Sequence, residues 1–559
     1  MHDALRPAGS LSVRRRPALL VALLLSAVLA VAAPGLVDPA SSAPRPTVSI
    51  RSSALVVETG TTVALRGRVQ GGFPGQRLDL QRWNGEKFVV DQRDTLSRTG
   101  RYRFRVEVPS GDSTWRVVLR AGRDEGRKVK GARSADVDLT GQDPVVPVDP
   151  ELERLPAEPS AAFASVVDIS ADGRWVLLVS TRTDLTPDED LNGDLDLFRW
   201  DRDTDQVLLV SGSRVAGRTG NGRSDQGEIS DDGQTVVFRS YASDLSLVDS
   251  DGEADAFLWR ASAPRPATLL PHPEVLAQAD GWHVEEVALS GNGETVALVE
   301  MPTSGAQRTG GRVYLYEDGA LSAQVDSPAT VVEEEAFETS GGLSLTTGGN
   351  ILAFYSSKSG LVNTDLDGAD DVFRLVRKGS GPGTLEIVSR DPVPDTVGWT
   401  GDSYDPQVSG SGRYVVFTST DSELTDVDAG LSGLAGRESV WRAEPGTGAM
   451  RLVSTSADGT ALADDHSSGP SVDDLGTVAF LSRGTNLVAG DTNGAEDAFV
   501  WTDGDVTLLP GDGTIPDDDA LAVELASDGR FVAFASTASN LMAPPWTGAA
   551  TVYVWGPLR

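Results

Sequence analysis

The 559-residue chain contains no cysteine, which excludes disulfide bonds and cysteine-ligated metal sites. It has four histidines, of which His272, His283 and His466 lie beyond the N-terminal segment, and none stands in a spacing such as H-E-x-x-H. No G-x-S-x-G nucleophile motif occurs, and no segment shows a helical period. These absences predict an all-β protein and favour a protein without chemistry of its own over an enzyme.

The N-terminus has the pattern of an export signal. Arg14, Arg15 and Arg16 precede an apolar run over residues 18–33, and AVA (30–32) and SSA (41–43) are small-residue cleavage sites. We therefore expect residues 1–43 to be a signal peptide and a short N-terminal segment. An uncleaved anchor is the alternative, because the run approaches the length of one membrane span. The expected location is secreted or at the cell surface of a bacterium, where stability need not come from disulfides.

Charge is unevenly distributed along the chain. Residues 51–140 carry 18 Lys and Arg against 11 Asp and Glu, whereas the whole chain has a net charge of −34. A basic module therefore precedes a strongly acidic one. An acidic surface repels phosphates and argues against nucleic acid as a partner.

Residues 44–140 are predicted to form a β-sandwich. Short alternating runs are separated by turn residues, and in RYRFRVEV (101–108) Tyr102, Phe104 and Val106 share one face while the arginines share the other. This stretch resembles the bacterial immunoglobulin-like domains of surface and secreted proteins. Residues 141–159 follow as a linker, since five prolines in this region make it extended and stiff.

From residue 160 to 559 the chain repeats itself. A small turn with glycine followed by an apolar strand recurs seven times, as in SADGRWVLLVS (170–180), with spacings of 53 to 64 residues. The aligned glycines are Gly173, Gly233, Gly293, Gly349, Gly412, Gly476 and Gly529. Each unit predicts four up-and-down strands, the pattern of a propeller blade. The last unit lacks one strand, which ELERL (151–155) is expected to supply, because closing the ring removes an open edge.

The repeat carries a specific resemblance. The pattern S-x-D-G-R-x-V-x-F-x-S, then D-x-N-G-x-x-D-x-F, then L-V-S resembles the TolB-type propeller repeats of secreted bacterial proteins. The fold class is thus all-β, an immunoglobulin-like sandwich followed by a propeller of seven blades, with six as the alternative because six is common in that family. The resemblance implies a scaffold that binds a ligand or partner.

An acidic loop between the second and third strands of several units resembles the calcium loops of integrin-type propellers. In DEDLNGDLD (188–196) the alternating oxygens of Asp188, Asp190, Asn192 and Asp196 surround a turn at Gly193. Calcium takes six to eight such oxygens. In the fourth unit, NTDLDGADD (363–371), the corresponding oxygens belong to Asn363, Asp365, Asp367 and Asp371. Units two and six keep three, so calcium is expected first in units one and four.

The same pattern also fits a purely structural turn. Asp and Asn accept backbone N–H bonds two residues on, and glycine supplies a positive φ. Phe198, Phe257, Phe373 and Phe499 would then anchor the third strands in the core. The sequence leaves both interpretations open.

The loops between the second and third strands and the long connections between units emerge on one face of a propeller. Trp282, Trp399 and Tyr404 lie in these connections and are candidate contact residues. We therefore expect a secreted or surface protein that binds an extracellular protein or an envelope glycan through this acidic face, with a membrane contact only through an uncleaved anchor. The alternative is a carboxylate-dependent glycan hydrolase or lyase on the same scaffold.

Overall fold

The computed structural model describes residues 46–558 except for short segments. The chain divides into two compact units, Met1–Pro144 and Val145–Arg559. Every regular element among the described residues is a β-strand, and none of these residues belongs to a helix that could span a membrane. The internal segments outside the described residues are 51, 53–55, 59–61, 85–86, 110, 125–126, 143–149, 158–159, 250–251, 272–281, 303–311, 318, 326–339, 359–360, 363–368, 378–382, 390–400, 423, 427–428, 434–435, 544 and 547. The predicted signal peptide and part of the linker also lie outside them.

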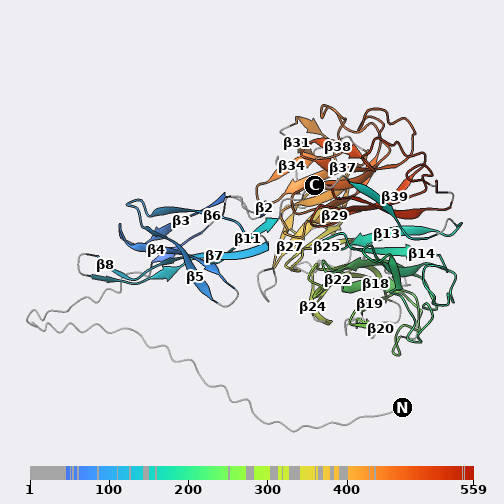
Figure 1. Cartoon of the computed structure of the whole chain (residues 1–559), viewed down its shortest axis with the longest axis horizontal. Helices are drawn as coiled ribbons and strands as arrows, with labels where there is room; N and C mark the ends of the chain where they lie inside the picture. The colour runs from blue at the N-terminus through green and yellow to red at the C-terminus, as the bar shows by residue number, and fades with distance from the viewer. Residues whose placement is uncertain are drawn as a thin grey trace, which may run out of the picture. The chain divides into compact units, whose positions relative to one another are not determined.

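The first unit is a sandwich of two sheets with one core (Figure 1). The alternation predicted in RYRFRVE is confirmed, since Tyr102, Phe104 and Val106 are buried and the intervening arginines are exposed. One sheet has the order β1-β3-β6 and the other β2-β11-β7-β4-β5, with β10 beside β7 and a separate hairpin β8-β9. The strands are β1 (Thr47–Val48), β2 (Val56–Glu58), β3 (Thr62–Gln70), β4 (Arg77–Trp83), β5 (Phe88–Thr95), β6 (Arg101–Glu107), β7 (Gly111–Leu119), β8 (Gly122–Asp124), β9 (Arg127–Val129), β10 (Ala132–Arg133) and β11 (Val137–Gln142).

The second unit consists of seven four-stranded antiparallel sheets, one for each sequence repeat (Figure 1). Blade one is β13 (Ala164–Ile169), β14 (Trp175–Ser180), β15 (Asp196–Asp201) and β16 (Gln206–Leu209). Blade two is β17 (Ser224–Ile229), β18 (Thr235–Ser240), β19 (Asp255–Arg260) and β20 (Ala263–Leu269). Blade three is β21 (Trp282–Leu289), β22 (Thr295–Pro302), β23 (Arg312–Glu317) and β24 (Ala320–Gln324). Blade four is β25 (Ser340–Leu345), β26 (Ile351–Ser356), β27 (Asp371–Val376) and β28 (Thr384–Ile387).

The remaining blades follow the same order. Blade five is β29 (Ser403–Val408), β30 (Val415–Ser419), β33 (Ser439–Glu444) and β34 (Ala449–Leu452), with a small hairpin of β31 (Thr425–Asp426) and β32 (Leu431–Ser432). Blade six is β35 (Ser467–Val472), β36 (Val478–Ser482), β37 (Asp497–Thr502) and β38 (Asp505–Leu508). Blade seven is β39 (Ala520–Leu525), β40 (Val532–Ser536), β41 (Thr551–Gly556) and β12 (Glu151–Arg154).

The ring closes as the sequence predicts. Strand β12 pairs antiparallel with β41, from Glu151 opposite Gly556 to Arg154 opposite Tyr553. The segment before the first repeat therefore completes the last blade. The structure has seven blades, and the alternative of six is not observed.

The repeated glycine serves both the turn and the contact between blades. Gly233 has a φ of 70°, which disfavours residues with a side chain. A Cβ added there would lie 2.1 Å from Cδ1 of Trp175 in the preceding blade, and one added to Gly173 would lie 2.3 Å from Phe531. These two turns thus pack against the start of the neighbouring blade's second strand, where only glycine fits.

Backbone hydrogen bonds join successive turns into a ring, at what we call the turn end of the propeller. The N–H of Ala171 donates to the carbonyl of Asp231 at 3.1 Å, and the N–H of Asp231 donates to that of Gly291 at 2.7 Å. Between blades five and six a side-chain carboxylate replaces the backbone carbonyl as acceptor, since Ser411 N–H donates to Asp474 Oδ1 at 2.6 Å. Asp528 N–H closes the circle on the carbonyl of Ala171 at 3.2 Å. The opposite end, with the acidic loops and the connections between blades, is the loop end.

The predicted aromatic anchors lie in the blade cores. Phe198, Phe257, Phe373 and Phe499 are all buried. Three of them stack on a phenylalanine of the preceding strand, with ring centroids 5.6 to 5.7 Å apart. The prediction that these residues anchor the third strand is confirmed.

Candidate functional site

The acidic loop of blade one is a closed hydrogen-bonded turn. Asp190 Oδ1 accepts the N–H groups of Asn192 at 3.0 Å and Gly193 at 2.9 Å, and Gly193 has a φ of 65°. The Asn192 amide nitrogen donates to the carbonyls of Gly220 at 2.9 Å and Gly222 at 3.2 Å, and it points toward the Asp196 carboxylate. The amide therefore ties the loop to the connection that leads into blade two.

Buried aspartates complete this turn. Asp196 is buried, and desolvation raises its pKa to about 7, while the bond from Ser211 Oγ at 2.9 Å opposes the shift. Blade six repeats the arrangement, because Asn493 Nδ2 donates to Asp497 Oδ2 and to the carbonyl of Pro516, both at 2.9 Å. Burial raises the pKa of Asp497 to about 6. These contacts match the structural interpretation of the motif.

The predicted calcium ligands fall into two groups. Asp188, Asp190, Asn192 and Asp196 lie in the described loop of blade one. In blade four only Asp371 is described, and it accepts a hydrogen bond from Ser389 Oγ at 2.8 Å. Asn363, Asp365 and Asp367 lie outside the described residues. Within the described part of the chain, no three Asp, Glu or His side chains gather as a metal site. Calcium in units one and four therefore stays a prediction.

The candidate contact aromatics have different surroundings. The Tyr404 hydroxyl donates to Glu438 Oε1 at 2.5 Å, and the Tyr404 side chain is half-buried in β29. Trp282 begins β21, and Trp399 lies outside the described residues. The Tyr404 hydroxyl therefore joins the first and third strands of blade five, because Glu438 directly precedes β33.

Exposed apolar side chains lie instead on hydrogen-bonded loops of blades one and two. Leu247 and Val248 in the β18–β19 loop are 84% and 79% exposed, and Val215 and Leu191 in neighbouring loops are 54% and 46% exposed. We call these four residues the loop-end patch. Acidic residues border it in the same loops, among them Asp190 and Asp244.

Hydrogen bonds hold the loops that carry this patch. Glu189 N–H donates to the carbonyl of Gly217 at 2.9 Å, which joins the blade-one loop to the connection after it. Arg214 N–H donates to the carbonyl of Asp244 at 3.2 Å, which joins that connection to the blade-two loop. The patch is therefore carried by three interlocked loops.

A cavity of about 670 Å³ lies along the axis, lined by the innermost strands. Three of its carboxyl groups come from a position that sequence analysis missed, the residue five places before each aligned glycine. This position holds Asp168, Glu228, Ala288, Ser344, Gln407, Ser471 and Glu524. Six of the seven line the cavity, and the described lining contains no Lys, Arg or His.

Several of these side chains also join adjacent blades. Asp168 Oδ2 accepts the N–H of Ile229 at 2.7 Å, and Glu228 Oε2 accepts the N–H of Leu289 at 2.5 Å. Ser344 and Ser471 make the same bond to the next blade at 3.0 Å. Blade three has Ala288 at this position, and Glu286 accepts the N–H groups of Gly342 and Leu343 in its place, at 2.7 and 2.6 Å.

The axial carboxyl groups bind protons unusually tightly. Each retains some accessible surface because it borders the cavity, yet burial along the axis is the largest cause of every shift. Desolvation and repulsion by Asp168 raise the pKa of Glu524 to about 8, and desolvation raises that of Asp168 to about 7. The pKa of Glu228 is raised for the same two reasons as that of Glu524. Part of the group is therefore neutral at pH 7.

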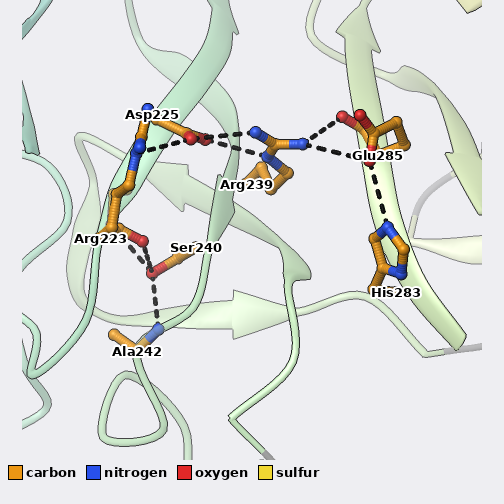
Figure 2. A network of polar contacts seen from close by, with 8 residues as sticks. Arg223, Asp225, Arg239, Ser240, Ala242, His283 and Glu285 are labelled. Carbon is orange, nitrogen blue, oxygen red and sulfur yellow. Dashed lines mark hydrogen bonds and ion pairs between the residues drawn. The ribbon is translucent and has the colours of Figure 1, made fainter. Parts of the chain in front are cut away.

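Asp225, which also lines the cavity, has compensating charges. Arg239 donates to both of its oxygens at 2.9 and 3.0 Å, and Arg223 approaches it at 2.8 Å. Figure 2 shows that Arg239 continues to Glu285 in blade three, whose carboxylate also meets His283 Nε2 at 3.1 Å. This network ties β17, β18 and β21 together beside the cavity.

Comparison with known proteins adds little beyond the fold. No family model and no curated protein matches the chain. A solved structure from a structural and mechanistic analysis of two prolyl endopeptidases aligns over 70% of this chain and 50% of that one, with 13% identity and a TM-score of 0.41. A complex of KlAtg21 with the coiled coil of AgAtg16 aligns over 63% and 98%, with 8% identity and a TM-score of 0.27. This chain thus spans half the length of the endopeptidase, and its own strand pairing identifies the second unit as a seven-bladed β-propeller.

Proposed function

We propose that the protein is an exported binding or scaffold protein that holds a protein partner on the loop end of its propeller. The observation that carries this proposal is the loop-end patch. Single aliphatic side chains as exposed as Leu247 and Val248 are common on protein surfaces, whereas a group of them with a polar rim is typical of a protein interface. Aliphatic rather than aromatic residues favour a protein over a glycan as the partner.

The charge of the propeller suggests the character of that partner. The unit is strongly acidic, so a surface that carries Lys or Arg around an apolar centre complements it. We also propose that the propeller belongs with the TolB-type repeats and the sandwich with the bacterial immunoglobulin-like domains. The repeat motif and the two-sheet topology support these assignments.

A differential capture experiment tests the proposal. The exported chain, its Leu247→Ser/Val248→Ser variant and a Leu208→Ser control are immobilised and exposed to the envelope proteins of the producing cell. Leu208 is 46% exposed on β16, outside the patch. We expect one partner to be retained by the wild type and the control and lost from the double variant. Equal retention by all three would contradict a loop-end interface, and competition by envelope polysaccharide would identify a glycan instead.

The hydrolase or lyase alternative would place its chemistry in the axial cavity, where carboxyl groups have raised pKa values. Against it, Asp168 and Glu286 accept backbone N–H groups with both of their oxygens. These carboxylates therefore hold blades together. Release of reducing sugar from envelope glycans by the wild type but not by Glu524→Gln would establish the alternative.

A further inference from the structure

The three-stranded sheet β1-β3-β6 of the sandwich carries arginines on the side that points away from the core (Figure 1). Tyr102, Phe104 and Val106 of β6 are buried, so the residues between them point outward. All the outward arginines of β3 and β6 are exposed. We call them the arginine face: Arg66, Arg68, Arg101, Arg103 and Arg105.

The strand register places these arginines opposite one another. Arg66 of β3 pairs with Arg103 of β6, and Arg68 pairs with Arg101. Arg105 extends the row on β6 by one position. Facing residues of antiparallel strands have Cβ atoms about 5 Å apart, and the next pair on the same face lies about 7 Å along the strands. The arginines therefore start from two short parallel rows.

Acidic side chains of the described residues do not neutralise this face. The ion pairs described in the sandwich converge on Asp79 in the other sheet, which Arg77, Arg93 and Arg120 approach at 2.6, 4.0 and 2.5 Å, and none of them involves the arginine face. Among the described residues of the three strands, Glu107 at the end of β6 is the one acidic residue on the same side. The face is therefore strongly basic.

This arrangement has a cost for the isolated protein. Like charges directly opposite one another destabilise a sheet. Repulsion by Arg66 is the largest cause that lowers the pKa of Arg103, and desolvation and repulsion by Arg105 add to it. The fold does not require arginine here, because any polar residue suits the solvated side of an antiparallel sheet. An anionic ligand bound across the two rows would remove the repulsion.

We propose that the arginine face binds a linear anionic polymer whose repeating units are joined by phosphodiester groups. A phosphodiester has two free oxygens, so one group can accept hydrogen bonds from an arginine of each strand. A polymer that lies along the strands would place successive groups on the pair Arg66 and Arg103 and on the pair Arg68 and Arg101. This face is separate from the loop-end patch and does not depend on the partner proposed for that surface.

Other anionic partners fit the two rows less well. A carboxylated polysaccharide or an acidic peptide carries each anionic group on one side of its chain, so each group reaches one row. Membrane surfaces also take up large apolar side chains, and single-stranded nucleic acids stack their bases on aromatic ones. The described residues of the arginine face include neither kind. A polymer of phosphodiesters without bases matches what the face offers.

Fluorescence anisotropy of labelled poly(glycerol phosphate) with the full chain tests this proposal, over a series from about 0.05 to 0.3 M salt. Each arginine that neutralises a phosphate releases a counter-ion, so the logarithm of the binding constant falls linearly with that of the salt concentration. For five arginines we expect a slope of about −3. Absence of binding, or binding that does not change with salt, would overturn the proposal.

Two further polymers test the chemistry of the ligand. Polygalacturonate with the same number of charges is expected to bind severalfold more weakly, because its carboxylates do not bridge the rows. Equal binding would overturn the assignment to phosphodiesters. Oligothymidylate has phosphodiesters and bases, and tighter binding of this polymer than of poly(glycerol phosphate) would identify a nucleic-acid surface instead.

Two double variants separate the arginine face from the general charge of the sandwich. Arg66→Gln/Arg103→Gln removes one facing pair and is expected to weaken binding about tenfold or more and to make the salt slope shallower by about 1. The control, Arg123→Gln/Arg133→Gln, removes the same charge from exposed positions of β8 and β10 and should keep both the affinity and the slope. Equal weakening by the two double variants would mean attraction to net charge alone, and the proposal would be wrong.

Thermal unfolding distinguishes lost binding from lost structure. Because Arg66→Gln/Arg103→Gln removes a repulsion between facing strands, we expect it to unfold at the same temperature as the wild type or at a higher one. A lower unfolding temperature together with lost binding would show that the pair serves the fold, which contradicts a binding face.

Discussion

The two ends of the propeller are built from the same repeat and have diverged in opposite ways. At the turn end, seven small turns with glycine are joined blade to blade by hydrogen bonds. At the loop end, the acidic loop keeps its Asn-Gly or Asp-Gly core in four units and loses it in the others. The ring geometry restricts the turn end, while the loop end is free to vary in sequence and to bind.

Acidic residues show the same contrast. Near the axis, desolvation raises the pKa of Asp168 and Glu524. On the exposed connections of the loop end, hydrogen bonds from Ser539 lower the pKa of Asp517, and those from Thr460 and Ser456 lower that of Asp458. Burial along the axis therefore favours the protonated form of a carboxyl group, whereas hydrogen bonds from hydroxyl and N–H donors favour the ionised form of these two exposed aspartates.

Substitution of one glycine at each end gives the strongest test of the difference between the two ends. Gly233 at the turn end and Gly193 at the loop end have φ values of 70° and 65°, but only Gly233 lies against a neighbouring blade. We expect Gly233→Ala to reduce the free energy of unfolding by about 3 kcal/mol or more, from the backbone cost plus the clash with Trp175. Gly193→Ala, with open space around its Cβ, should cost only about 1 kcal/mol. Urea unfolding measures both, and equal losses would contradict the role given to inter-blade packing.

A pair of carboxyl groups tests the electrostatic difference. Glu524 has a pKa of about 8 in the native state, so between its ordinary pKa and this value the folded chain holds a proton that the unfolded chain has lost. Stability from this group is present at low pH and is lost as the pH rises through that window. We expect Glu524→Gln to leave unfolding at pH 5 almost unchanged and to stabilise the protein at pH 8 by roughly 1–2 kcal/mol.

Asp517→Asn is the matching variant at a carboxyl group whose pKa is lowered instead of raised. Because the native pKa of Asp517 is lowered, its contribution is present at neutral pH and lost as the pH falls through the native pKa. The variant should therefore be less stable than the wild type at pH 7 and converge with it in acid. Thermal unfolding over a pH series measures both variants. Identical pH profiles would mean that carboxyl groups at the axis and at the loop end do not differ in this respect.

The smallest expected effect concerns calcium at the loop end. Asp190→Ala removes an acceptor of two backbone N–H groups, so it should cost about 1 kcal/mol whether calcium or a chelator is present. Asp365→Ala examines the equivalent loop of unit four. A midpoint that rises with calcium in the wild type, and does not rise in either variant, would establish the metal sites that the sequence predicts.

The sequence predicts the scaffold well because its signals are periodic. Repeated glycines, alternating strands and the recurring phenylalanines each mark a position with the same surroundings in every blade, and the missing strand indicates the closure by β12. The axial carboxyl groups were missed because strand alternation alone does not show which strand faces the axis. A signal was present nonetheless: DIS, EIS and ELA stand at the same distance before Gly173, Gly233 and Gly529.

The loop-end patch could not be predicted for a different reason. Leu247 and Val248 appear in the sequence as ordinary apolar residues in a loop, and their exposure follows from hydrogen bonds between three loops that are separate in the chain. The axial cavity likewise depends on the innermost strands of seven blades meeting at one axis.

The pairing of β12 with β41 also determines when, during synthesis, the propeller can complete its folding. The first propeller strand to be synthesised has no partner until the last strand of the chain exists, because Leu152 lies opposite Trp555. A chain interrupted before residue 551 would leave both β12 and β40 with bare edges, open to proteases and to other unpaired strands. The pairing of β12 with β41 therefore forms only in a chain that extends through β41, and a chain truncated before it cannot close the ring.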